Sequence, residues 1–167
     1  MSREMYPLVA TGADFSEALM AHCDFFITVP DSVFRTTYEH IPGLIVASRE
    51  NHAVAEAFGA RLGGRRPCVL IQNSGLGLAL DAMIGLFRLY EMGCMFIVSN
   101  RGELGWEEVQ HREWGAITDD LLKLMGAEVF DFEGLGMEAV ARAADASWRH
   151  AAVSAVVVHR GNLDEAS

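Results

Sequence analysis

Two short segments of the sequence carry groups that could bind and activate a ligand. Glu50 ends an apolar segment and directly precedes an Ala-rich stretch with helical spacing, so its carboxylate would lie at the electropositive start of a helix. The run Gln72 to Gly77 leaves another apolar segment through two glycines, Gly75 and Gly77, where a ligand could approach the backbone amide groups closely. Taken singly, the two patterns also fit a helix-capping acid and a tight turn.

Further polar groups follow other apolar segments. Asp31 and Ser32 come shortly after one segment, Arg101 comes shortly after another, and Gln110 and His111 follow further along the chain. An imidazole is well suited to proton transfer at neutral pH, so His111 is a candidate acid or base. Ordinary roles remain open for these residues: helix caps for Asp31 and Ser32, a solvated histidine and a surface salt bridge.

The hydrophobic pattern predicts the elements that must position these groups. Short segments rich in Val, Ile and Phe predict strands, and the segments between them have helical spacing. Strands are expected at 24–29, 44–47, 68–71, 95–98, 127–132 and 155–158, and helices at 14–21, 32–40, 52–62, 76–90, 117–124 and 136–148. Nearly continuous apolar strands indicate a sheet covered on both faces, so we expect an α/β fold: a doubly wound, mainly parallel six-stranded sheet between helices.

Length and composition restrict the class of protein. A chain of 167 residues, 51% of them hydrophobic and 22% charged, is typical of one compact domain, here residues 1–167. The net charge of -10 and the scattered 13 Lys and Arg residues argue against nucleic acid as a partner. No apolar run is long enough to cross a membrane, which favours a cytoplasmic protein. The cysteines, Cys23, Cys68 and Cys94, are expected to be buried packing residues.

The segment from Ser99 to Gly115 is polar, contains Trp106, His111 and Trp114, and is predicted to be a long loop at a strand end, where function is common. Parallel sheets bind ligands outside the carboxyl ends of their strands, so this loop and the residues described above should meet at one edge. A Rossmann dinucleotide site is disfavoured because its third glycine position holds Leu80. A flavodoxin-like nucleotide-binding domain remains an alternative.

In combination, these motifs resemble the pyrimidine-binding domain, or α subunit, of the sulfopyruvate and phosphonopyruvate decarboxylases, which use thiamine diphosphate. The resemblance covers most of the chain, and its motifs occur in the expected order. It rests on Val29-Pro30-Asp31-Ser32, Arg49-Glu50-Asn51-His52-Ala53-Val54-Ala55 with Gly59, Gln72-Asn73-Ser74-Gly75-Leu76-Gly77, Arg101-Gly102-Glu103, Gln110-His111 and Gly115 to Leu121.

The resemblance implies roles for individual residues. The family's glutamate at the position of Glu50 hydrogen-bonds the aminopyrimidine ring of thiamine diphosphate, and proton sharing there prepares the cofactor to attack the ketone of a 2-oxo acid. Arg101 or Arg35 would bind the anionic tail of the substrate. The resemblance further implies a catalytic role for His111, cofactor contacts from Asn73, Ser74, Gly75, Leu76 and Gly77, and substrate contacts from Asp31, Ser32, Arg101 and Gln110.

Two departures from the family pattern limit what the resemblance implies. Leu78 stands where the family usually has Asn, which leaves the exact substrate open and keeps alive a non-catalytic binding module of the same fold. The chain also contains no Gly-Asp-Gly followed at a distance by Asn, the family's signature of diphosphate and magnesium binding. No metal ligand is therefore expected in this chain, and a β subunit would supply Mg2+ and the diphosphate clamp.

The implied protein is an α subunit of a carboxy-lyase that is active only with its β subunit, as a homodimer or a larger heteromer. A length of 167 residues fits such a free-standing subunit. The expected reaction converts 3-sulfopyruvate to sulfoacetaldehyde and CO2. Conversion of 3-phosphonopyruvate to phosphonoacetaldehyde is the alternative.

Overall fold

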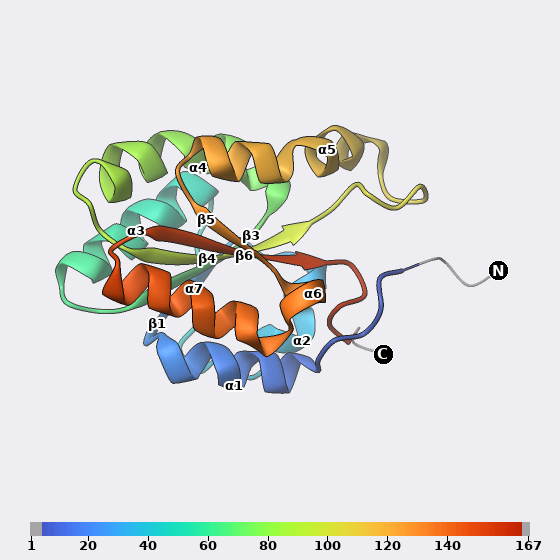
Figure 1. The fold of residues 1–167 in the computed structure, drawn as a ribbon, viewed down its shortest axis with the longest axis horizontal. Helices are drawn as coiled ribbons and strands as arrows, with labels where there is room; N and C mark the ends of the chain where they lie inside the picture. Colours follow the sequence, from blue (N-terminus) through green and yellow to red (C-terminus); the bar gives the residue numbers. More distant parts are fainter. Residues whose placement is uncertain (1–4, 165–167) are drawn as a thin grey trace.

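The apolar segments form a six-stranded sheet with the strand order β2-β1-β3-β4-β6-β5. Every neighbouring pair of strands is parallel (Figure 1). The computed structural model describes residues 5–164. The strands are β1 (Phe25–Thr28), β2 (Ile45–Val46), β3 (Pro67–Gln72), β4 (Cys94–Asn100), β5 (Glu128–Asp131) and β6 (Val153–His159).

Helices cover both faces of the sheet, which confirms the predicted doubly wound α/β fold. Figure 1 shows α1 and α7 on one side of the strands and α3, α4 and α5 on the other. One side carries α1 (Gly12–His22), η1 (Ser32–Phe34), α2 (Arg35–Tyr38), α6 (Phe132–Leu135) and α7 (Met137–Arg149). The other carries α3 (Glu50–Leu62), η2 (Asn73–Gly75), α4 (Leu76–Ala82), the π-helical η3 (Met83–Arg88) and α5 (Val109–Leu124).

The central strands read as continuous apolar runs because both of their faces are buried. Along β4, Phe96 and Val98 pack into the core beneath α3 and α4, whereas Met95 and Ile97 pack into the core beneath α1 and α7. Each fully buried side chain of this size stabilises the fold by about 1.5–3 kcal/mol. The edge strand β2 differs, because Ile45 and Val46 are exposed. The cysteines are buried and free, as predicted.

The predicted loop from Ser99 to Gly115 is wrong in extent. Strand β4 continues to Asn100 and α5 already begins at Val109, so the connection comprises only residues 101–108. Gly115 does not end a loop but lies within α5, where the chain passes very close. A Cβ atom on Gly115 would lie 2.9 Å from the carbonyl oxygen of Arg101, so this contact accounts for the glycine. Helix α6 was also not predicted.

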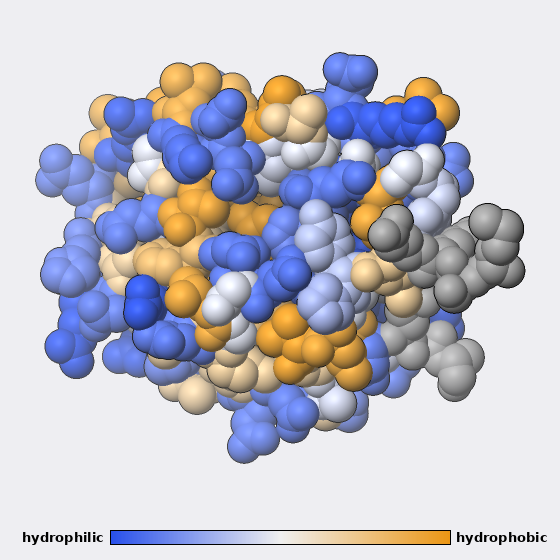
Figure 2. All heavy atoms as spheres, turned by 45° about the vertical axis from the view of Figure 1, so that its right-hand side comes forward, coloured by the Kyte–Doolittle hydropathy of each residue, from blue (hydrophilic) through white to orange (hydrophobic). Residues whose placement is uncertain are grey.

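The strand order places a topological switch point between β1 and β3. The chain passes from β1 outward to β2 and then returns across β1 to form β3, and such reversals open a crevice at the carboxyl edge. Glu50 follows β2, Asp31 follows β1 and Asn73 follows β3, so these residues lie at the edge where such a crevice is expected. Figure 2 turns this side of the molecule toward the viewer and shows hydrophilic and hydrophobic residues interleaved over it.

Candidate functional site

Glu50 and Gly75 meet at the crevice. Glu50 is the first residue of α3, so the unpaired amide groups of that helix start surround its carboxylate with positive potential. Gly75 ends the short turn η2, and a Cβ atom at this position would lie 2.5 Å from Glu50 Oε1. Within residues 5–164, no side chain donates a hydrogen bond to the half-buried Glu50 carboxylate. The structure thus joins the two motifs that the sequence singled out.

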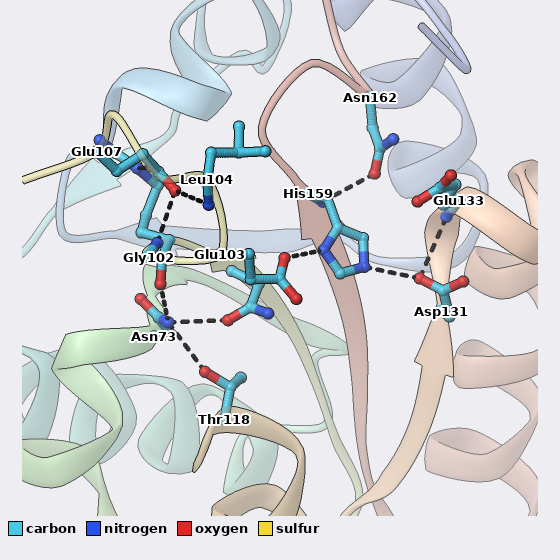
Figure 3. A network of polar contacts seen from close by, with 12 residues as sticks. Asn73, Gly102, Glu103, Leu104, Glu107, Thr118, Asp131, Glu133, His159 and Asn162 are labelled. Carbon is cyan, nitrogen blue, oxygen red and sulfur yellow. Dashed lines mark hydrogen bonds and ion pairs between the residues drawn. The ribbon is translucent and has the colours of Figure 1, made fainter. Parts of the chain in front are cut away.

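Asn73 is a fully buried link between three elements rather than an open ligand contact. Its amide nitrogen lies 2.9 Å from Asn100 Oδ1, from the Arg101 carbonyl oxygen and from Thr118 Oγ1, and its side-chain oxygen accepts from the Ser74 amide at 3.0 Å. Figure 3 shows the bond from Asn73 to Thr118 of α5 among the polar contacts of this region. The side chain of Asn73 is therefore engaged within the protein, and its predicted cofactor contact stays a prediction.

The remaining residues of the glycine loop lie around this link. Ser74 is half-buried and its hydroxyl accepts a hydrogen bond from Gln72 at 2.7 Å. Leu76 is fully buried in the core beneath α4, so only its backbone is available for a ligand. Gly77 is exposed at the start of α4, where the ring of Trp114 from α5 lies over it.

Arg101, Asp31 and Ser32 form a second group, which joins the end of β4 to the end of β1. Arg101 Nη1 lies 3.4 Å from both Asp31 Oδ2 and Ser32 Oγ, and its Nε donates to Glu107 Oε1 at 2.5 Å. Asp31 also caps η1, because its Oδ1 accepts from the Val33 amide at 2.7 Å. The capping role left open by the sequence is thus correct for Asp31, and Arg101 forms a buried ion pair rather than a surface one.

Glu107 was not identified from the sequence, yet it organises the connection 101–108. Its second oxygen accepts from the amides of Gly102 at 2.7 Å and Leu104 at 3.4 Å, so one carboxylate holds both ends of the loop (Figure 3). Burial raises the pKa of Glu107, but the hydrogen bonds and the charge of Arg101 outweigh it and hold that pKa below its usual value. Glu107 is therefore an anion at neutral pH.

Gln110 and His111 lie in the first turn of α5, directly after this loop. Gln110 is exposed, whereas His111 is half-buried and its Nδ1 is a buried atom without a hydrogen-bond partner within the described residues. Such orphaned polar atoms are rare in proteins, and each of them calls for an explanation. Arg35, in α2, is exposed. The catalytic and substrate roles predicted for these residues stay predictions.

A third polar group occupies the ends of β5 and β6. His159 Nδ1 lies 2.5 Å from Glu103 Oε2, and His159 Nε2 lies 3.0 Å from Asp131 Oδ1 (Figure 3). Burial lowers the pKa of His159, but its bonds to Glu103 and Asp131 outweigh this and raise that pKa above its ordinary value. Applying the strand-end rule to the last two strands would have found Asp131 and His159.

Comparison with known proteins places the chain in a family. It is 32% identical, over 122 residues, to the sulfopyruvate decarboxylase subunit alpha of Methanothermobacter thermautotrophicus, a match that covers 67% of this chain and 74% of that one. The chain belongs to the family of sulfopyruvate decarboxylase alpha subunits. No family model matches the chain.

Other relatives agree with this membership of the alpha-subunit family. The Methanococcus maripaludis sulfopyruvate decarboxylase subunit alpha is 33% identical over 104 residues, which are 57% of this chain and 60% of that one. The phosphonopyruvate decarboxylase of Streptomyces viridochromogenes is 38% identical over 85 residues, which are 50% of this chain but only 21% of that one.

A solved structure supports the fold of this alpha-subunit family member. The 2-oxoglutarate:ferredoxin oxidoreductase from Magnetococcus marinus matches 89% of this chain and 28% of its own, with a TM-score of 0.68 and 15% identity. At that identity the likeness concerns the fold alone.

Among residues 5–164, no helix is long and apolar enough to cross a membrane, and no cluster of three or more His, Cys, Asp or Glu side chains could hold a metal ion.

Proposed function

We propose that this chain binds the aminopyrimidine half of thiamine diphosphate and, with a β subunit, decarboxylates 3-sulfopyruvate to sulfoacetaldehyde and CO2. The observation that carries the proposal is the Glu50 carboxylate at the start of α3, which has no hydrogen-bond partner among the side chains of residues 5–164 and packs against the bare backbone of Gly75. A carboxylate held open in this way can share a proton with a ligand ring nitrogen. Family membership supports the same reaction.

The residues of the crevice fit the aminopyrimidine ring of the cofactor. Glu50 would form a hydrogen bond with the ring nitrogen. The backbone of Asn73 to Gly77 would line the adjacent wall of the site, where Gly75 has no side chain that would block the ring. When bound, thiamine diphosphate supplies the electron sink that accepts the electron pair left behind by departing CO2. Glu50 would share a proton with the ring nitrogen of the cofactor and would not contact the substrate.

On the substrate side, we assign proton transfer to His111 and orientation of the 2-oxo acid to Gln110, Asp31 and Ser32. His111 is only half-buried and lies in the first turn of α5, directly after the connection that carries Arg101, which supports a place for its imidazole beside the substrate. Arg101 would bind the anionic tail, because its terminal nitrogen Nη1 makes long contacts of 3.4 Å with Asp31 and Ser32. Arg35 is the weaker candidate, since it is exposed on α2 and has no such anchored geometry.

The 167 residues lack the diphosphate and magnesium signature, so we assign those functions to a β subunit. The word alpha in the names of the relatives supports a partner of this kind. We expect the isolated chain to be catalytically silent. We also expect it to form homodimers or larger heteromers with β subunits. Turnover by the pure chain would contradict this assignment.

The proposal is tested by co-expressing the chain with its candidate β subunit and assaying aldehyde formation from sulfopyruvate, with thiamine diphosphate and magnesium. Glu50→Gln should reduce turnover by about 10²–10⁴-fold, the range for a positioned acid or base, because an amide cannot share the proton. Glu56→Gln, an exposed change on the same helix, serves as the control and should leave turnover unaltered. A Glu50→Gln complex as active as the wild type would refute the proposal.

Phosphonopyruvate is the second candidate substrate. The phosphonopyruvate decarboxylase of Streptomyces viridochromogenes supports it, and Leu78, which departs from the family pattern, leaves the choice between the two acids open. Running both acids in the same assay decides between them by kcat/KM. An assembled complex that turns over neither acid would favour a binding module without catalysis.

A further inference from the structure

We propose that Glu107 is a positioning residue, which holds Arg101 as the receptor for the anionic tail of the substrate. This inference rests on the proposed function, because it concerns how the same site recognises a 2-oxo acid with a sulfonate or phosphonate tail. Glu107 would not touch the substrate. It would act through the guanidinium group of Arg101.

The two ends of the Arg101 guanidinium are held very differently. The inner nitrogen, Nε, donates to Glu107 Oε1 at 2.5 Å, at the short end of the range for charge-assisted bonds. The outer nitrogen, Nη1, lies 3.4 Å from Asp31 Oδ2 and from Ser32 Oγ, well beyond an ideal charge-assisted bond. One edge of the guanidinium is therefore fixed, and the other has capacity to bind an incoming anion.

Burial explains why Arg101 needs an anchor. The side chains of Arg101 and Glu107 are only 8% and 1% exposed, and a buried guanidinium without a paired carboxylate is strongly destabilising. Glu107 neutralises that charge through Nε and leaves the terminal fork for other acceptors. Ser32 is exposed beside the fork, so an anion could reach Nη1 from solvent along the Ser32 hydroxyl.

An anion at the outer edge has to displace a group that is already there. Two carboxylates, Asp31 and Glu107, face the one guanidinium, so a further anion must take the place of one of them instead of adding to both. Asp31 has a second role as the cap of η1 through Oδ1 and the Val33 amide. A sulfonate or phosphonate oxygen that binds Nη1 would replace only the long contact of Asp31, which keeps its capping bond.

The backbone of Arg101 is fixed independently of its side chain. Its carbonyl oxygen accepts from the Asn73 amide at 2.9 Å, and the next amide, that of Gly102, donates to Glu107 Oε2 at 2.7 Å. Asn73 thus holds the backbone from which the Arg101 side chain extends, and Glu107 holds that side chain at Nε. Such preorganisation reduces the ordering that tail binding would otherwise require.

The experiment measures two quantities on the assembled α/β complex: KM and kcat for sulfopyruvate, and the Kd of 3-sulfopropionate, which keeps the tail and the carboxylate but has no reactive ketone. Glu107→Gln preserves an oxygen acceptor for the loop amides and removes the charge that anchors Arg101. It should raise both KM and Kd by about 10-fold or more while kcat changes little, because a bond to a charged group is lost.

Two further variants separate positioning from folding. Glu108→Gln, an exposed change one residue away, should alter neither quantity, and Arg101→Lys should raise both, because a lysine cannot be held at one nitrogen and bind at another. Propionate, which has no tail, should bind the wild type and Glu107→Gln complexes equally. Retained circular dichroism and an unchanged elution volume would show that Glu107→Gln still folds and assembles.

The outcomes distinguish this inference from the proposed function. If the complex turns over sulfopyruvate but Glu107→Gln changes neither the KM for sulfopyruvate nor the Kd of 3-sulfopropionate, the proposed function stands and the inference is overturned. Binding of 3-sulfopropionate that depends on Glu107, in a complex without turnover, would refute the proposed reaction and support the receptor. Failure of the wild-type complex to bind 3-sulfopropionate would overturn the inference.

Discussion

The carboxyl edge of the sheet has two halves that treat their charged groups in opposite ways. At the ends of β2 and β3, Glu50 has no hydrogen-bond partner among the described side chains and lies against the bare backbone of Gly75. At the ends of β5 and β6, His159 is shared between Glu103 and Asp131. An unpaired carboxylate is available to a ligand, whereas carboxylates already paired contribute to stability. The first half is therefore the candidate site and the second supports it.

The supporting half also fixes the loop that carries Arg101. Glu103 belongs to the connection 101–108, and its bond to His159 attaches that connection to the last strand. The imidazole of His159 stacks on Tyr6, with ring centroids 4.5 Å apart. Burial, with the neighbouring Glu103, raises the pKa of Tyr6 to about 12, so the phenol is neutral at physiological pH. Changes in this half should act on stability first.

The largest effect is expected on turnover, from a substitution that crowds the unpaired Glu50 carboxylate. Gly75→Ala would place a methyl group 2.5 Å from Glu50 Oε1 and push the carboxylate out of position. We expect turnover of the assembled complex to fall by about 10²-fold or more, since small misplacements of a catalytic group have effects of this size. Gly59→Ala is the matched control, because that helical position faces open space. Equal activity of the two variants would remove the proposed role of the Glu50–Gly75 contact.

The boundary between the halves should respond mainly in stability. Asn73→Ala removes the donor shared by Asn100, Arg101 and Thr118 and leaves buried acceptors unpaired. The free energy of unfolding should fall by about 2–4 kcal/mol, measured by urea denaturation of the isolated chain. Thr118→Val removes only one of these partners and should cost less. A loss below that of Thr118→Val would show that Asn73 is not the link between the halves.

The smallest effect is expected from pH in the paired half. Because the pKa of folded His159 is raised above its ordinary value of 6.5, the protonated form stabilises the fold. That stability is fully present below pH 6.5 and is lost as the pH rises through the folded pKa. The loss should be about 0.5–1 kcal/mol, because Asp131 is half exposed and water screens the pair.

The measurement is the difference in urea unfolding free energy between pH 6 and pH 8.5 for the wild type and for His159→Phe, which keeps a ring to stack on Tyr6. The wild type should lose more stability over this interval than the variant. Arg142→Ala, which breaks an exposed pair with Glu138, controls for general effects of surface charge. Identical pH dependence in the wild type and His159→Phe would contradict the assignment.

The sequence predicted the fold because the central strands are buried on both faces and therefore appear as unbroken apolar runs. It also predicted that Glu50 and the Gln72–Gly77 loop would share an edge, since parallel strands end on the same side. It could not predict Glu107, which lies in a polar loop and acquires its role only when Arg101 and the amide of Gly102 come within reach. The alternative role of Asp31 as a helix cap is confirmed, whereas its contact with Arg101 was not predicted.

His159 and the start of α5 were missed for a different reason. The strand-end rule reaches His159 itself, but its contact with Glu103 depends on the pairing of strands far apart in the chain, and no local pattern encodes that contact. Gly115 weakened the helical pattern locally, although its lack of a side chain serves the close approach of Arg101 and Gly102. Tertiary contact therefore outweighed the local preference against glycine in a helix.

The close approach of α5 to the loop restricts how this family member can change its specificity. Gly115 rests on the backbone of Arg101 and Gly102, while Trp114 on the same helix lies over Gly77. An inserted or deleted residue between 101 and 115 would turn the helix and misplace one of these contacts. We expect natural and engineered variants to keep this spacing and to adapt to new substrates by point substitutions at outward positions such as Gln110.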